Sequence, residues 1–404
     1  MDMILKKNDL FLFLFFIILI FLGLINILDF LSILLVFLTY ISIGLIVEKK
    51  SSIHMMFFVG YSTFIFLPAL LNWYYLDINF HMFFMSSVVA CFFLFLTRET
   101  KVRKFEDMGG GVKFFYFVFS LFIILVCLLG VGDFVAYIIA FFIILLSLCF
   151  KQNNIKNNSL YFLVFVVTFF VYIYFSWGGF GRTVVFGWLL LALLQFCYSI
   201  EFNLNKYFFA LLPGLAASLL SSRDILNLQF NGFESSLNDS AYQPYRLSST
   251  FIDNYNKNGF DFLGFFDQIL FTLFVYIPRA IWLDKPYGFG FEYTVQHLDQ
   301  YLVEAGHSIA STLIGDHIYY LGYFGIISSL IVFGVIALLT KLLYRIPGLN
   351  GNGVLIFSAS MMVLVWGGMT SFSARIALPT IIFLVIYFIL RRFLINKTKV
   401  RWGL

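Results

Sequence analysis

Apolar runs of about twenty residues follow one another along this chain, and they constrain its fold more than any other feature. A run of this length spans the hydrocarbon core of a bilayer. Only 12% of the 404 residues are charged, whereas soluble domains carry about 25%, so polar side chains are too few to cover a globular surface. Because hydrocarbon offers no water to bond the backbone, such runs must be helices. The sequence therefore predicts an all-α integral membrane protein.

We predict about twelve transmembrane helices from these runs. The first run is too long for the core of a cleaved signal peptide and lacks a small-residue cleavage site, so it counts as a span. The predicted spans lie near residues 10–28, 30–47, 54–73, 80–97, 113–130, 132–150, 159–176, 183–200, 206–220, 319–341, 353–370 and 376–393.

The positions of lysine and arginine predict how the chain is oriented. With both termini in the cytoplasm, 19 of the 26 basic residues fall on the cytoplasmic side, as the positive-inside rule requires. The opposite orientation would reverse this bias and is rejected. The remaining seven basic residues are Arg182, Arg223, Arg246, Lys257, Arg279, Lys285 and Arg375.

Residues 221–317 form a long polar segment that holds roughly half of the 21 carboxylates. We predict one large extracytoplasmic loop here, between nine spans in residues 1–220 and three spans with a cytoplasmic tail in residues 318–404. Within the loop, residues 262–282 are apolar but end at Pro278 and Arg279. We interpret them as a re-entrant or interfacial helix, because a full span there would invert everything downstream.

Several classes of protein are disfavoured by what the sequence lacks. The four cysteines all fall in predicted spans, which excludes a disulfide framework and a zinc ribbon. There is no Gly-rich phosphate-binding loop ending in lysine, no His-Glu-x-x-His and no Asp-x-Asp. The net charge of +5 comes from basic residues scattered in short loops. We therefore expect no metal, no cofactor and no nucleic-acid partner.

Arginines on the extracytoplasmic side are the first candidates for a binding site. Arg182 ends the Gly-rich turn 177–182, and Arg279 and Lys285 lie in a stretch bounded by Pro278 and Pro286. A guanidinium offers a rigid fork of donors to phosphate oxygens, so these groups suit a pyrophosphate. Arg375 and Arg223 are weaker members of the set. Snorkelling or a salt bridge to a loop carboxylate is the alternative for each arginine alone.

A cluster of proton acceptors lies just before the tenth predicted span, within residues 304–317. Transfer of a glycosyl group requires a base that deprotonates the acceptor hydroxyl, and histidine and carboxylates are the usual ones. His307 is the first candidate, followed by Asp316 and Glu304. The alternative is that these residues cap or hydrogen-bond the start of a helix.

Three motifs resemble those of the O-antigen polymerases, the Wzy type: Gly-Gly-x-Gly-Arg at 178–182, Pro-Arg-x-x-Trp-x-Asp-Lys-Pro at 278–286 and His-Ser-x-Ala-x-Thr-x-x-Gly-Asp at 307–316. The likeness covers the second half of the chain by motif and the first half by span count. It implies a C-type membrane glycosyltransferase fold, an undecaprenyl-pyrophosphate donor and metal-independent transfer at the periplasmic face. On this likeness, Arg182 and Arg279 match the family's pyrophosphate-binding arginines.

The resulting hypothesis is a polymerase of lipid-linked oligosaccharide repeat units in the bacterial inner membrane. Lipid-linked oligosaccharides and the bilayer are the expected partners, and the family likeness adds a chain-length regulator. An O-antigen ligase, which moves the finished glycan to lipid A, is the first alternative. A flippase or exporter without chemistry is the second, although the predicted spans carry few of the ionisable residues that such transporters use.

Overall fold

The computed structural model describes most of the chain from residue 29 onward. The described residues form helices and turns, and no strand occurs among them. The span predicted at 10–28 lies outside them. The described residues are 29–74, 80–98, 111–131, 135–151, 155–177, 182–217, 242–297, 300, 304, 309–346, 349 and 351–394.

Contacts divide the chain into two compact units, each assembled from segments that are distant in the sequence. The first unit comprises residues 1–98, 205–338 and 361–374, and the second comprises residues 99–204, 339–360 and 375–404. These units cut across the three consecutive segments that the sequence suggested.

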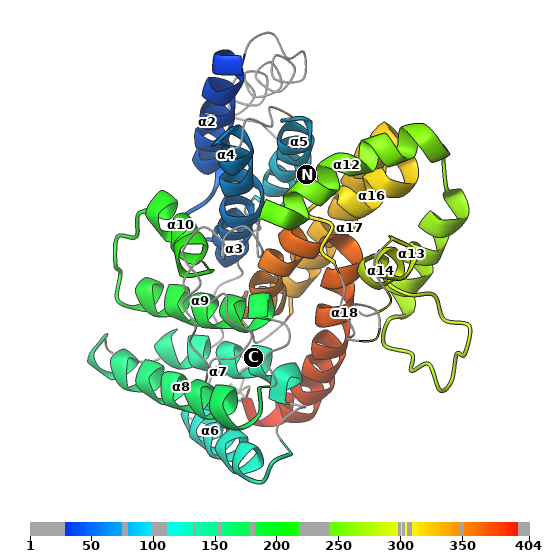
Figure 1. Ribbon diagram of the computed structural model, residues 1–404. Helices are drawn as coiled ribbons and strands as arrows, with labels where there is room; N and C mark the ends of the chain where they lie inside the picture. The colour runs from blue at the N-terminus through cyan, green and yellow to red at the C-terminus, as the bar shows by residue number, and fades with distance from the viewer. Residues whose placement is uncertain are drawn as a thin grey trace, which may run out of the picture. The chain divides into compact units, whose positions relative to one another are not determined.

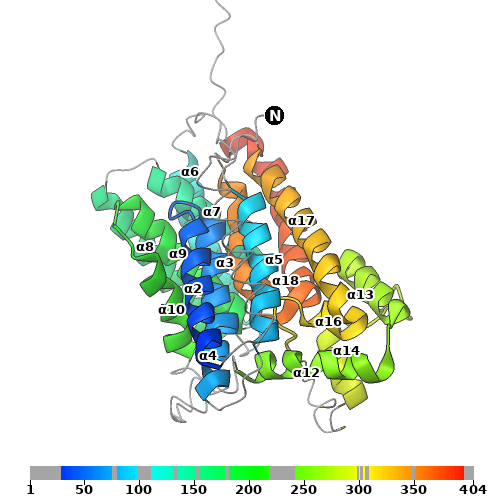
Figure 2. The same ribbon diagram turned by 90° about the horizontal axis from the view of Figure 1, so that it is seen from above.

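The first unit contains a group of apolar helices (Figure 2). Helix α2 lies beside α5, and α3 packs against α10. The turn η1 is π-helical and continues α3 into α4 without interruption. The bounds are α2 Asp29–Ile46, α3 Ser52–Tyr61, η1 Ser62–Phe66, α4 Leu67–Tyr74, α5 His81–Leu96 and α10 Lys206–Ala217.

A second group of helices in the first unit comes from the polar segment and the run that follows it. Helix α12 crosses over α16, and α13 lies beside α16 (Figures 1 and 2). The helix predicted at 262–282 ends at Phe274, after which the chain forms turns up to Gly288. The bounds are α12 Gln243–Asn258, α13 Phe262–Phe274, α14 Phe289–His297, α16 Gly315–Leu321, η4 Gly322–Phe324 and α17 Gly325–Tyr344.

The second unit contains four neighbouring helices, α6 to α9 (Figure 1). Aromatic rings stack between them, as Tyr116 does on Phe142 and Phe142 on Phe165. Small polar side chains also pair between helices, for example Ser120 and Thr168 at 2.6 Å, as is common where no solvent competes. The bounds are α6 Gly111–Leu128, α7 Val135–Lys151, α8 Ile155–Phe175 and α9 Arg182–Ser199.

Helix length and composition support a membrane location. Among the described residues, five helical stretches are long and apolar enough to cross a bilayer. Several shorter apolar helices of 10–17 residues also occur among the described residues, α13 included. The predicted helical character of the apolar runs from residue 30 onward is thus confirmed. The five stretches are Ser52–Trp73, Gly111–Leu128, Asn157–Phe175, Gly315–Tyr344 and Asn352–Ile389.

The two last predicted spans are two helices that meet at a kink, and they share the label α18 (Leu355–Leu394). Only the position of the break differs from expectation. The sequence placed a polar connector near Ser371 to Arg375, but these residues are helical. Serine and arginine tolerate helical geometry, so polarity alone does not end a helix. The interruption lies earlier, at Gly368, whose φ of 68° and ψ of −165° only glycine adopts readily.

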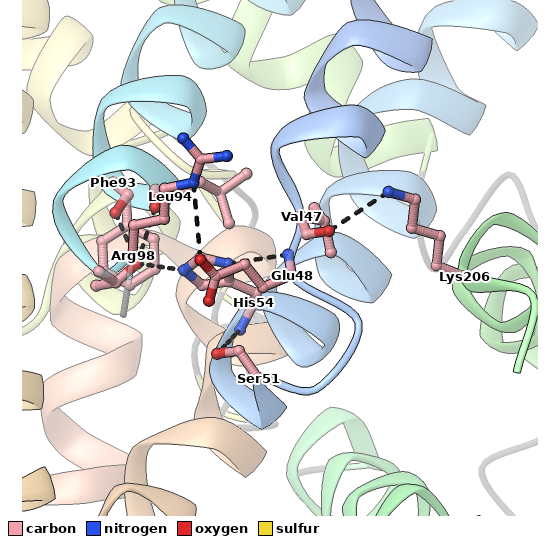
Figure 3. A network of polar contacts seen from close by, with 9 residues as sticks. Val47, Glu48, Ser51, His54, Phe93, Leu94, Arg98 and Lys206 are labelled. Atoms are coloured by element: carbon pink, nitrogen blue, oxygen red, sulfur yellow. Dashed lines mark hydrogen bonds and ion pairs between the residues drawn. The ribbon is translucent and has the colours of Figure 1, made fainter. Parts of the chain in front are cut away.

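A polar clasp ties the α2–α3 loop to the end of α5 (Figure 3). The buried ring of His54 accepts the Glu48 N–H on Nδ1 at 3.2 Å, so its proton is on Nε2, which faces the Thr97 hydroxyl at 3.0 Å. Arg98 reaches the Glu48 carboxylate at 3.7 Å. Both ring nitrogens are therefore satisfied, and the geometry gives His54 a structural role.

We expect His54→Leu to lower the free energy of unfolding by about 2 kcal/mol, because it removes both hydrogen bonds of a buried ring, to the Glu48 N–H and to the Thr97 hydroxyl. His54→Asn keeps an acceptor near the Nδ1 position, so its effect should be smaller. Thermal unfolding of the detergent-purified protein measures both variants. An unchanged melting temperature for His54→Leu would contradict the role of the clasp.

Candidate functional site

The turn that follows α13 is built around two of the predicted phosphate ligands, Arg279 and Lys285. The Arg279 guanidinium donates to the carbonyls of Lys285 and Pro286, the latter at 2.9 Å. Its face covers the Tyr287 ring, 3.7 Å from the ring centroid. These contacts fix the plane of the guanidinium, while its partial exposure leaves it within reach of a ligand.

Lys285 is turned inward in the same turn. It is 7% exposed, and its ammonium donates to the carbonyls of Val275 at 2.7 Å and Ile277 at 2.8 Å. Burial, and then the nearby Arg279 charge, lower the pKa of this ammonium. Lys285 therefore caps the carbonyls at the end of α13 and shapes the turn that presents Arg279.

A carboxylate that the sequence did not single out, Glu292, lies beside this turn. Its Oε2 accepts the Gln268 amide at 2.6 Å and the Tyr320 hydroxyl at 3.0 Å. Its Oε1 accepts the exposed Gln296 amide at 3.2 Å. Gln268 also donates to the Tyr287 carbonyl at 3.1 Å. One buried amide on α13 thus connects the basic turn to Glu292 on α14.

Aromatic rings from α12, α14 and α16 pack together next to Glu292. Tyr293 lies 4.4 Å from the His297 ring, and Phe251 contacts both Tyr293 and Tyr319. His297 Nε2 is 2.8 Å from the Tyr319 hydroxyl, which also donates to Gln296. The packing of these rings holds α12, α14 and α16 in register around the carboxylate.

Burial raises the pKa of Glu292 above its usual value, and the neighbouring charges of Asp261 and Asp267 act in the same direction. The hydrogen bonds from Tyr320 and Gln296 oppose the shift by stabilising the ionised form. A half-buried carboxylate with a raised pKa accepts a proton more readily than a solvated one.

Asp316, one of the predicted bases, lies against the interruption in α18. It is 2% exposed, and its two oxygens accept the N–H groups of His317 and Met369, each at 3.1 Å. Met369 begins the helical segment after Gly368, so the carboxylate caps a helix N-terminus, where negative charge is favourable. This geometry gives Asp316 a structural role, the alternative that the sequence left open.

The loop before α16 completes this contact with α18. The Thr312 N–H donates to the Trp366 carbonyl at 2.9 Å, and the Thr312 hydroxyl bonds Ser248 of α12 at 3.1 Å. Thr312 adopts a positive φ of 59°, which is uncommon for a β-branched residue. Backbone strain and a buried cap therefore coincide at the α18 interruption.

The other predicted site residues belong to other elements or lie outside the described residues. Glu304 is exposed and bonded to Gln300 at 2.9 Å. Arg182 is the first residue of α9, and Arg375 lies within α18, where the sequence expected the start of a span. The Arg182 side chain, His307 and Arg223 lie outside the described residues. Only Arg279 and Lys285 are thus seen in direct contact.

No protein-family model, curated protein or solved structure matches this chain. Within the described part, no three His, Cys, Asp or Glu side chains gather as a metal site would require. The candidate site therefore consists of the Arg279 turn and the Glu292 network, taken together.

Sequence reasoning missed Glu292 because its setting is assembled in three dimensions. Its partners Gln268 and Tyr320 are 24 and 28 residues away and lie on separate helices. The only local signal is the spacing of Glu292 and Gln296, which places them on one helix face. That spacing is equally typical of a solvated helix surface.

Proposed function

We propose that this protein polymerises oligosaccharide repeat units carried on undecaprenyl pyrophosphate, at the periplasmic face of the bacterial inner membrane. The three motifs that resemble O-antigen polymerases support this proposal. So do the all-helical, apolar architecture and the candidate site in the polar segment. About twelve spans, a C-type glycosyltransferase fold and cytoplasmic termini belong to the same proposal.

The observation that carries the proposal is the position of Arg279 beside an exposed apolar surface. Leu263, Ile281 and Leu283 are each about four-fifths exposed. Phe260 contacts both Phe262 near the start of α13 and Phe324 at the start of the α17 region. The apolar surface of 260–283 is therefore continuous with that of a helix long enough to cross the bilayer.

We infer that α13 lies in the membrane interface. Its 13 residues extend about 20 Å, too short for a hydrocarbon core of about 30 Å. An apolar outer face with a polar inner residue, Gln268, is typical of an interfacial helix. Arg279 would then meet the head group of a lipid-borne diphosphate at the depth where that group lies.

In the proposed reaction, a hydroxyl of one lipid-linked repeat unit attacks the anomeric carbon of the growing glycan. The new glycosidic bond forms as the bond to the lipid diphosphate breaks. Arg279 stabilises the charge that develops on the leaving diphosphate. Arg182, Arg375 and Arg223 remain predictions for the same role.

Purified protein supplied with synthetic undecaprenyl-pyrophosphate-linked repeats tests the proposal. We expect a ladder of longer lipid-linked glycans without added metal or nucleotide. Cells that lack the protein should carry single repeat units on lipid A. An unchanged ladder of long chains in those cells, or no new glycosidic bond in the purified system, would refute polymerisation.

The two alternatives give other products in the same assays. A ligase would transfer glycan only when lipid A is supplied, and its loss would leave lipid A without glycan. A flippase would move the lipid-linked repeat across a vesicle membrane without forming any bond. Formation of a glycosidic bond by the purified protein, without any vesicle, therefore distinguishes polymerisation from transport.

A further inference from the structure

We infer that Glu292 is the catalytic base that deprotonates the acceptor hydroxyl. This inference rests on the proposed function and assigns the role of the base to a residue outside the 304–317 segment. It follows from the geometry of Glu292, from the contacts of the competing carboxylates and from the link to Arg279.

The geometry of Glu292 leaves one acceptor position free. An ionised carboxylate has about four lone-pair sites, and the donors from Gln268, Tyr320 and Gln296 occupy three. The free site is on Oε1, the oxygen bonded to the exposed Gln296. The other oxygen is held by two donors from α13 and α16. The carboxylate is thus fixed at one oxygen and open at the other, as a base requires.

The other described carboxylates near this site either cap a helix or are exposed to solvent. Asp316 is buried with both oxygens bonded to backbone N–H groups. Asp261 caps α13 by accepting the Gly264 N–H at 2.8 Å. Asp267, Asp284 and Glu304 are exposed. Among the described carboxylates of this segment, Glu292 alone combines partial burial with an open oxygen.

Gln268 gives the pairing of Glu292 with Arg279 a physical basis. Its amide donates at once to Glu292 and to the carbonyl of Tyr287, the residue whose ring lies under the Arg279 guanidinium. The proton acceptor and the diphosphate-binding group are therefore held by one short network. In the proposed step, the proton of the acceptor hydroxyl passes to Glu292 Oε1. The hydroxyl oxygen bonds to the anomeric carbon as the bond from that carbon to the lipid diphosphate breaks, and the lipid diphosphate departs.

Glu292→Gln tests this assignment, because it preserves size and can keep an oxygen on the Gln268 and Tyr320 donors but cannot take up a proton. We expect chain extension by the purified protein to fall at least about 100-fold. The melting temperature and the affinity for the lipid-linked repeat should stay near wild type. Glu292→Asp should restore part of the rate, since it returns a carboxylate in a shorter form.

The dependence of the extension rate on pH is a second test, because a purely structural role of Glu292 would not change it. Wild-type extension should rise with pH as Glu292 ionises, and Glu292→Gln should lose this rise. Among the described residues, the titratable groups that interact with Glu292 are Asp261 at the N-cap of α13, Asp267 of α13, and Tyr319 and Tyr320 of α16. His297 of α14 contacts Tyr319. Asp267→Asn is the matched control. It removes a charge that raises the pKa of Glu292, so the rise should move to lower pH at an unchanged maximal rate.

Distinct outcomes would overturn the two proposals. Suppose that the wild type extends chains and that Glu292→Gln does so at a rate within about threefold, with the same pH profile. This result would refute the base assignment alone. So would a loss of extension in Glu304→Gln with Glu292→Gln unaffected. A wild-type protein that forms no glycosidic bond would refute the proposed function and this inference with it.

Discussion

Gly368→Ala should strongly destabilise this protein, because it adds a methyl group at a strained and crowded backbone position. The backbone at Gly368 lies in a region that costs other residues about 1–3 kcal/mol. A Cβ there would lie 2.7 and 2.8 Å from the Asp316 carboxylate oxygens and 2.8 Å from the Ser311 hydroxyl. Because Asp316 is bonded to Met369 and His317, it cannot withdraw without losing its partners. We expect a total loss of about 3–5 kcal/mol in the free energy of unfolding.

Gly259→Ala provides a matched control for this prediction. Gly259 has nearly the same backbone conformation, with φ 76° and ψ −162°, but a Cβ there would meet nothing within 4 Å. It should cost only the backbone term of about 1–3 kcal/mol. Denaturant unfolding in detergent compares the two. Equal losses would show that the contact between Asp316 and the α18 interruption contributes nothing.

The apolar runs predicted the helices well because the bilayer imposes one solution on them. Each run from residue 30 onward must satisfy its own backbone groups, and only a helix does so. The connection between the last two runs could not be predicted in the same way. Ser371, Ser373 and Arg375 look like a loop but are helical. The interruption lies at Gly368, in a Gly-Gly pair within an apolar run, where the hydrophobic pattern masks the breaker.

Of the candidate site, the sequence predicted the basic residues Arg279 and Lys285 but not the Glu292 network. Arg279 stands out because a charge beside an apolar run needs a reason. Its turn is closed by Lys285, whose inward orientation depends on free carbonyls at the end of α13. The apolar run continues to residue 282, so its pattern does not mark the end of α13 at Phe274. Glu292 and Gln268 come together only through the packing of α13, α14 and α16, which no local pattern encodes.

We expect Arg279→Ala to reduce chain extension by the purified protein about 100-fold, because it removes the charge that stabilises the leaving diphosphate. Arg279→Lys keeps a charge but loses the planar fork and the contact with Tyr287, so most of the loss should remain. Arg246→Ala is the matched control, since Arg246 is an exposed arginine of the same polar segment. Its extension rate should equal that of the wild type.

Arg279 also bonds two carbonyls of its own turn, so a rate loss alone does not distinguish binding from structure. Inorganic pyrophosphate separates the two. A ligand that binds the native state raises the melting temperature in proportion to its saturation, and we expect pyrophosphate to do so in the wild type and in Arg246→Ala. In Arg279→Ala, this shift should vanish even where the unliganded protein melts near its normal temperature. If Arg279→Ala is still stabilised by pyrophosphate and still extends chains, the guanidinium serves only to close the turn after α13.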